Sequence, residues 1–160
     1  LKDQPFNLDF VREIIEQAAI VYNSKKSGIL ELGGGVPKNT AQQTGPLLDQ
    51  ILRKDHGGQD YIIQITDARP DTGGLSGATL QEGKSWGKVQ DSHEDLITVY
   101  TDSTIAFPLL ALYALSNEES REQKRIYKNL DKYYKTLQDS ASKVPDKFAD
   151  ILKKSDINLD

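Results

Sequence analysis

Hydrophobic residues near the start of the chain recur with the spacing of an amphipathic helix. Asn7 is a candidate N-cap, and the helix that follows it would end near the polar stretch SKKSG, residues 24–28. The positions that would form its buried stripe are Leu8, Val11, Ile14, Ile15, Ala18, Val21 and Tyr22. This pattern predicts a helix with one face packed on a core.

Three short apolar stretches further along the chain predict β-strands, at residues 28–32, 60–66 and 96–102. Helical patterns alternate with them. Strands separated by helices favour an α/β fold with a parallel sheet and flanking helices, in which ligands bind where the strands end.

Two helices are predicted after the first and third strands. Residues 36–52 form the first of these, with Leu47, Leu48, Ile51 and Leu52 as its apolar positions. Residues 103–116 are almost wholly apolar, and Pro108 should break or kink the helix that they form.

From Asn117 onward the chain becomes strongly charged but keeps a helical period. The apolar positions that carry this period are Ile126, Leu130, Tyr133, Tyr134 and Leu137. They predict an amphipathic helix, and a short final helix is expected from Pro145. We therefore divide the chain into residues 1–116, an α/β unit, and residues 117–160, a helical extension.

Composition narrows the class of protein. The chain has 160 residues, 37% of them hydrophobic and 28% charged, which is typical of a folded globular domain. A net charge of -4 gives little electrostatic support for nucleic-acid binding. The sequence shows neither a membrane-spanning apolar run nor a signal-peptide pattern, so the cytoplasm is the expected compartment.

The reactive residue types present limit which nucleophiles and metal ligands the protein can use. Cysteine is absent, which excludes disulfides, thiolate metal sites and cysteine nucleophiles, and the isolated His56 and His93 argue against a histidine metal site. A nucleophile must be a lysine, serine, threonine or carboxylate. The sequence begins at Leu1 without an initiator methionine, which indicates a fragment or a processed piece.

Two glycine-rich segments are candidate binding elements. Residues 33–35 are three glycines that follow the first strand, where they would let backbone amides approach a ligand, although a tight strand-to-helix turn explains them equally well. Residues 67–88 are a 22-residue segment with six glycines or prolines. A loop of that length is usually functional or mobile, and the alternative is a solvated excursion.

The heptapeptide EGKSWGK, residues 82–88, raises the question of a lysine nucleophile. Burial beside the indole of Trp86 would favour the neutral amine of a lysine, and Glu82 could pair with a cation. The alternative is that Lys84 and Lys88 are both solvated charges. Asp102, after the third strand, could cap the following helix or accept hydrogen bonds from a ribose, and these roles are compatible.

Four ordered stretches together resemble the deoxyhypusine synthase family. They are LGGGVPKN (32–39), DYIIQITDARPDTGGLSGA (60–78), EGKSWGK (82–88) and VYTDSTIAFPLL (99–110). The resemblance covers about residues 6–115. It implies the C-terminal half of a Rossmann-like NAD-binding domain.

The resemblance also implies an activity, the NAD-dependent transfer of a 4-aminobutyl group from spermidine to an acceptor amine through an enzyme-lysine imine. Lys88 falls on the family's nucleophile and Lys84 is a bystander. The polyamine would be held by Asn39, Gly73, Gly74, Ser76, Glu82 and Trp86. The positions that would line the NAD site are Gly34, Asp67, Ala68, Asp102 and Ser103.

Two positions depart from the pattern of the protein-modifying synthases. Leu75 stands where a polyamine-binding Asp is usual, and Asn39 stands where a catalytic His is typical. An Asn at this place is also found in homospermidine synthases derived from the family, which use putrescine as the acceptor. PKNTAQQTGPLL, residues 37–48, looks most like the bacterial deoxyhypusine-synthase-like proteins.

The chain lacks the N-terminal half that the family normally has. We therefore expect a second chain, encoded separately or cleaved from the same precursor, to complete the fold. The resemblance also implies a homotetramer-like assembly. A non-catalytic subunit that binds NAD or a polyamine is the alternative from another functional class, suggested by the missing half, Leu75 and Asn39.

Overall fold

Three parallel strands form a sheet in the order β1-β2-β3 in the computed structural model, which describes residues 9–89, 96–117 and 122–141. The strands are β1 (Gly28–Leu32), β2 (Tyr61–Thr66) and β3 (Leu96–Tyr100). The register pairs Ile29 with Ile62 and Ile62 with Leu96. It likewise pairs Glu31 with Gln64 and Gln64 with Thr98. These strands and their flanking helices confirm the predicted parallel α/β fold.

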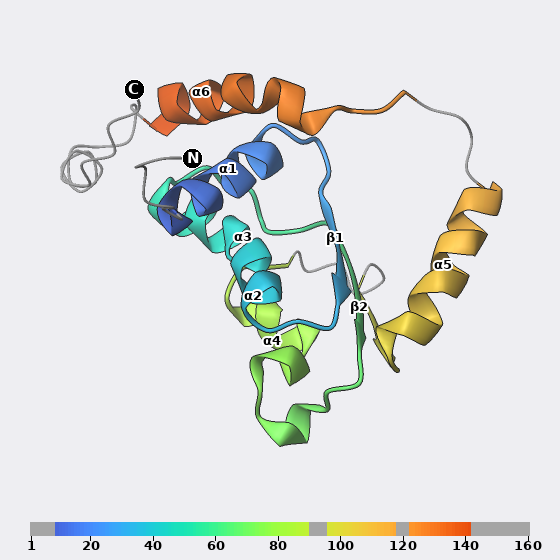
Figure 1. The fold of residues 1–160 in the computed structure, drawn as a ribbon. Coiled ribbons are helices and arrows are strands. Elements are labelled where there is room, and N and C mark those ends of the chain that lie inside the picture. Colours follow the sequence, from blue (N-terminus) through green and yellow to red (C-terminus); the bar gives the residue numbers. More distant parts are fainter. Residues whose placement is uncertain (1–8, 90–95, 118–121, 142–160) are drawn as a thin grey trace, which may run out of the picture.

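Helices cover the two faces of the sheet unequally. Helices α1 to α4 lie on one side of the strands and α5 lies on the other (Figure 1). The helices are α1 (Phe10–Tyr22), α2 (Val36–Gln42), α3 (Thr44–Pro46), α4 (Leu80–Ser85), α5 (Ser103–Asn117) and α6 (Leu130–Ala141). A π-helical turn (Leu47–Ile51) follows α3, and 3-10 turns span Pro70–Thr72, Leu75–Gly77 and Ile126–Asn129. No helix in these described ranges is long and apolar enough to cross a membrane.

Two helices differ from the sequence predictions at their ends. Asp9 caps α1, because its carboxylate accepts the N–H of Arg12 at 3.0 Å, whereas the predicted cap Asn7 lies outside the described residues. The C-terminal helix is shorter than predicted and follows Arg125, whose φ of +44° is incompatible with a right-handed helix. The helix expected from Pro145 also lies outside the described residues.

Helix α5 is continuous through Pro108, so of the predicted break or kink the break does not occur, and a kink stays a prediction. Pro108 lies little more than one turn into the helix. Its missing N–H and its ring therefore disturb only the first turn, and the rest of the helix keeps its hydrogen bonds.

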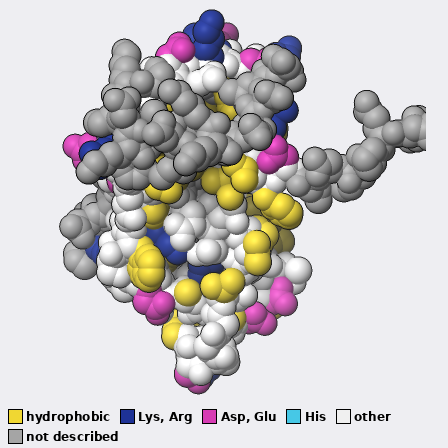
Figure 2. Space-filling model, turned by 90° about the vertical axis from the view of Figure 1, so that its left-hand side faces the viewer, with side chains coloured by type: hydrophobic (Ala, Val, Ile, Leu, Met, Phe, Trp, Pro, Cys, Tyr) yellow, Lys and Arg dark blue, Asp and Glu magenta, His cyan; other side chains and the backbone are white. Residues whose placement is uncertain are grey.

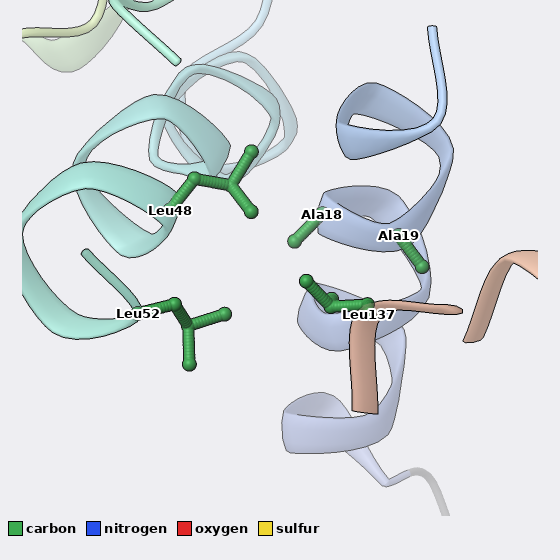
Figure 3. Close-up of a cluster of buried hydrophobic side chains, with 5 residues drawn as sticks. All are labelled: Ala18, Ala19, Leu48, Leu52 and Leu137. Atoms are coloured by element: carbon green, nitrogen blue, oxygen red, sulfur yellow. The ribbon is translucent and has the colours of Figure 1, made fainter. Parts of the chain in front are cut away.

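The main core lies between α1, the π-helical turn and α6. It consists of the buried residues Ala18, Ala19, Leu48, Leu52 and Leu137. Figure 3 shows Leu48 and Leu52 directed toward α1, with Leu137 reaching in from α6. The small alanines allow the helices to approach closely, so part of the charged C-terminal segment packs on the same core as the first helix.

A second cluster anchors the sheet to the segment before β3. Ile62 on β2 is buried against Leu80 of α4 and Val89, with Ile29 and Leu96 at the margin. Gln59 and Val89 form an isolated parallel bridge beside it. This packing holds the chain around residues 80–89 against the sheet.

Apolar side chains remain exposed on the α5 side of the sheet, opposite to helices α1 to α4. Leu30 and Leu32 of β1 and Ile97 and Val99 of β3 share the second sheet face and are 38 to 49% exposed. Helix α5 exposes Ile105, Phe107, Leu109, Leu112, Tyr113 and Leu115. We call these residues together the open apolar surface.

Candidate active site

The backbone of Lys88 is held by two neighbouring segments, one at Gly58 and Gln59 and the other at Gly83. Its N–H donates to the carbonyl of Gly83 (3.0 Å), and its carbonyl accepts the N–H of Gln59 (3.0 Å). Gly58 lies directly against it, since a Cβ on Gly58 would come within 2.7 Å of the carbonyl carbon of Lys88. The lysine therefore starts from a fixed position beside the sheet.

The amine of Lys88 contacts Asn39. Its Nζ donates to Oδ1 of Asn39 at 2.7 Å, although the two residues are 49 positions apart in the sequence. The side chain is partly buried, and this burial lowers the pKa of Lys88, while the charges of Glu31 and Glu82 act in the opposite direction. A lowered pKa increases the fraction of neutral amine, which is the nucleophilic form of lysine.

A second lysine and a glutamate are buried beside this contact, and the sequence analysis identified neither. Lys38 is 7% exposed and its Nζ donates to the carbonyls of Ala78 (2.7 Å) and Leu75 (3.4 Å). Burial lowers its pKa. Glu31 is 4% exposed, and its Oε1 accepts the amide N–H of Gln42 at 2.5 Å.

Burial has the opposite effect on the carboxyl group. It raises the pKa of Glu31, while the hydrogen bond from Gln42 and the charges of Lys38 and Lys88 lower it. A sequence signal for Glu31 was available, because a charged residue in an otherwise apolar strand is expected to have a buried partner. The side chains of Lys38, Asn39 and Gln42 come from α2, where spacings of three and four residues place side chains on one face.

The glycine-rich loop is fixed at its centre and open at its tip. Gly73 and Gly74 are exposed. The carbonyl of Ser76 accepts the Gln64 amide N–H (3.2 Å) and the Thr66 hydroxyl (3.5 Å), both from β2. Leu75, at the position of the usual Asp, is 53% exposed.

The rest of the predicted loop contains a helix that the sequence analysis missed. Helix α4 begins after Thr79, whose side chain accepts the N–H of Glu82 (3.3 Å) and donates to its carboxylate (3.2 Å). This reciprocal capping is a helix-start signal, and the threonine and glutamate three residues apart could have revealed it. Segment 67–88 is therefore partly helical.

Glu82 and Trp86 both lie on the surface near Lys88. Glu82 is exposed in the first turn of α4, and Trp86 is 63% exposed just after its end. The indole is therefore accessible to a ligand. Lys84, the predicted bystander, is partly buried. Figure 2 shows the face that carries α1 to α4, where Lys or Arg side chains lie between hydrophobic ones.

The predicted NAD residues lie where the strands end. Gly34 follows β1 with a φ of +87°, Asp67 and Ala68 follow β2, and Asp102 and Ser103 follow β3. The carboxyl ends of parallel neighbours meet at one edge, so the sheet brings these residues to the same edge as the glycine turn.

Asp102 has the predicted capping role. Its Oδ1 accepts the backbone N–H (2.8 Å) and the hydroxyl (2.7 Å) of Thr104. These two hydrogen bonds lower the pKa of Asp102. Within the described ranges, no three His, Asp or Glu side chains are grouped as metal ligands.

These features define a class of protein, a parallel α/β domain whose site centres on a partly buried lysine beside the carboxyl edge of the sheet. Residues 1–114 match the family model described as deoxyhypusine synthase. The chain belongs to the deoxyhypusine synthase family, as the ordered motifs predict.

Curated relatives include bacterial and archaeal proteins. The chain is 50% identical over 125 residues to a deoxyhypusine synthase-like protein of Nostoc punctiforme, covering 75% of the chain and 32% of the relative. It is 45% identical over 139 residues to one of Thermosynechococcus vestitus, covering 82% and 35%. A probable deoxyhypusine synthase 2 of Methanosarcina acetivorans is 43% identical over 119 residues, covering 74% and 33%. The chain thus spans about a third of the length of these relatives.

Proposed function

We propose that this chain carries the lysine nucleophile of an enzyme that transfers a 4-aminobutyl group from spermidine to an acceptor amine with NAD as cofactor. The contact between Lys88 Nζ and Asn39 Oδ1, at 2.7 Å in a partly buried place, carries the proposal. It holds a lysine with a lowered pKa next to a residue at the family's catalytic position.

Lys88 would act as a neutral amine. Its lone pair attacks the carbon of the protonated imine of oxidised spermidine, and one proton moves from Lys88 Nζ to the leaving nitrogen. The bond from that carbon to the leaving nitrogen then breaks, and diaminopropane departs. The butylamine group then remains on Lys88 as an imine. Asn39 orients the amine by its side-chain carbonyl but cannot accept a proton as a base at neutral pH.

The exposed groups around Lys88 suit a cationic substrate. Glu82 supplies a negative charge and Trp86 an accessible aromatic face, both of which attract an ammonium group. The loop with Gly73, Gly74 and Ser76 would place its backbone along the chain of the polyamine. In this proposal Leu75 contributes apolar contact instead of a counter-charge.

The residues at the carboxyl edge fit part of an NAD site. The carboxylates of Asp67 and Asp102 can accept hydrogen bonds from ribose hydroxyls. Gly34 has a left-handed backbone, and a Cβ built there would have Lys38 Cβ, at 3.9 Å, as its nearest neighbour, so its backbone is open to a ligand. Ala68 and Ser103 would line the same site of a Rossmann-like domain. These residues would hold part of NAD, which would supply hydride-transfer chemistry to the site when bound. We assign this chain only the binding contacts.

Asn39 favours a second candidate acceptor. A translation-factor lysine is the acceptor of the protein-modifying synthases, whereas the Asn is shared with homospermidine synthases that use putrescine. Both acceptors present a primary amine, so the site around Lys88 is compatible with either.

Incubating the full-length protein that contains this chain, or its complete complex, with NAD and spermidine should place an aminobutyl group on Lys88. Borohydride reduction followed by peptide mass spectrometry would detect it. Parallel reactions with putrescine and with a hypusine-type translation factor would identify the acceptor by its product. An unmodified Lys88 in a protein that still binds NAD would instead indicate a non-catalytic NAD- or polyamine-binding subunit.

We further propose that the open apolar surface binds the part of the family fold that this chain does not contain, either as a second chain or as another segment, within a homotetramer-like assembly. Helix α5 is apolar on several sides, and the sheet face beside it is partly exposed. Such a surface is larger than isolated exposed residues on a soluble monomer, which indicates an interaction site.

Replacing Leu112, which is 65% exposed on α5, by Glu should weaken this assembly about a hundredfold or more, because an unpaired charge would be buried. Native mass spectrometry across a dilution series would measure the change. Asn117→Glu adds the same charge at the end of α5 and serves as the control. If the described chain alone turns over spermidine as a single species, the assembly proposal fails.

A further inference from the structure

Two buried side-chain oxygens lie side by side on the helix-covered face of the sheet without a hydrogen-bond partner in the described structure. They are Oε2 of Glu31 and Oε1 of Gln64. Glu31 on β1 and Gln64 on β2 are register partners, so their Cα atoms are about 4.8 Å apart, the spacing of neighbouring strands. Glu31 is 4% exposed and Gln64 is 1% exposed.

Each side chain is anchored by its other polar atom. Glu31 Oε1 accepts from Gln42 of α2 (2.5 Å), and Gln64 Nε2 donates to the carbonyl of Ser76 (3.2 Å). Neither group can rotate freely to find another partner. Because a buried acceptor without a donor is costly, these two oxygens are arranged for an N–H donor that a bound molecule would bring.

The charges around the pair are mixed in sign, so the two acceptor oxygens suit an ammonium that can lose its proton. Lys38 and Lys88 both interact electrostatically with Glu31, and Glu82 interacts with both lysines. Lys38 is engaged by two backbone carbonyls, which stabilise its charged form. The burial that raises the pKa of Glu31 also makes it a better proton acceptor than an exposed carboxylate.

We propose that Glu31 and Gln64 bind the primary ammonium of the acceptor and that Glu31 removes its proton. The inference rests on the proposed aminobutyl transfer. It also assigns a base to a site in which Asn39 cannot serve as one.

The step transfers one proton and exchanges one C–N bond. The acceptor R–NH3+ gives a proton to the carboxylate of Glu31 and becomes R–NH2. Its lone pair forms a bond to the carbon of the protonated imine on Lys88, and one proton moves from the acceptor nitrogen to Lys88 Nζ. The bond from that carbon to Nζ then breaks, which leaves a protonated imine on the acceptor nitrogen. Lys88 leaves as a neutral amine and Glu31 releases its proton to solvent. No electrons are gained or lost.

The test separates the two half-reactions in the full-length protein or complete complex. In Glu31→Gln, transfer to putrescine or to a lysine of the translation factor should fall about 100-fold, the effect of losing a general base. Borohydride trapping on Lys88 should stay within about threefold of wild type, because that step precedes acceptor binding. The two acceptors distinguish a free diamine from a protein side chain as the source of the ammonium.

A matched control and a second variant keep the result interpretable. Glu13→Gln makes the same chemical change at an exposed position of α1 and should alter neither step. Gln64→Met removes the second acceptor oxygen and should raise the KM for the acceptor about tenfold, which decides the question if Glu31→Gln does not fold. Unchanged transfer in both variants, or equal loss of trapping and transfer in a folded variant, would overturn the inference.

The pH dependence adds a readout with a defined sign. The negative charge of Glu31 raises the pKa of Lys88. In Glu31→Gln, with Lys38 and Glu82 unchanged, the pH range in which the rate of borohydride trapping rises should therefore shift to lower pH. Opening the site to water would shift it to higher pH and contradict the proposed role. If wild type shows no trapping at all, the proposed function itself is wrong, and the inference falls with it.

Discussion

Lys88→Ala should abolish the covalent step and reduce transfer by about a thousandfold or more, because no other group can take over the bond to the substrate carbon. Lys88 has a partly buried amine, a lowered pKa and a direct contact to Asn39. Mass spectrometry after borohydride reduction would show no aminobutyl group at this position. A steady-state assay for diaminopropane would measure the loss of turnover.

Lys84→Ala is the matched control, since it removes the same side chain four residues earlier. We expect activity within about threefold of wild type, because the proposed mechanism gives Lys84 no role. Circular dichroism would check that both variants fold. Loss of activity confined to Lys84→Ala would reverse the assignment of the two lysines.

Gly58→Ala should destabilise the protein by about 3 kcal/mol, the combined effect of a left-handed backbone and an overpacked site. Gly58 has a φ of +87°, and its Cβ would lie 2.7 Å from the carbonyl carbon of Lys88 and from the nitrogen of Val89. Both contacts are to backbone, which cannot rotate away. Urea unfolding of the complete protein would measure the loss, and trapping on Lys88 should also decrease.

Gly33→Ala separates the cost of the left-handed backbone from the cost of overpacking. Gly33 also has a positive φ, +63°, but a Cβ there would meet no atom within 4 Å. We expect a cost of about 1 kcal/mol from the backbone conformation alone. Equal effects of the two substitutions would mean that Gly58 does not constrain Lys88.

The positions of most strands and helices could be predicted from local sequence patterns. Residues 28–32 and 60–66 have the length and apolar content of strands, and the structure places β1 and β2 there within one residue. Helix α4 was missed because Gly83 and the neighbouring glycines suggested a loop, although Thr79 and Glu82 form a helix start. In that segment a local capping signal outweighed a low helix propensity.

Individual residues of the site could be predicted from the sequence, but the contacts between them could not. Lys88 and Asn39 were each identified by resemblance, but their contact joins residues 49 positions apart. Glu31 and Gln64 both occupy the fourth position of an apolar strand, which was a usable signal only once the register was known. No pattern in the sequence distinguishes Lys38 from a surface lysine of a helix.

The sequence by itself determined the alternation of strands and helices, the family, and the types of residue able to do chemistry, because periodicity and motifs are local properties of the chain. Only the tertiary structure decided which polar groups are buried together and which apolar faces are left uncovered. Burial and the distance between Glu31, Gln64 and Lys88 depend on strand register and on how α2 packs against the sheet. Those contacts set the pKa of Glu31 and of Lys88, and so the chemical role of each.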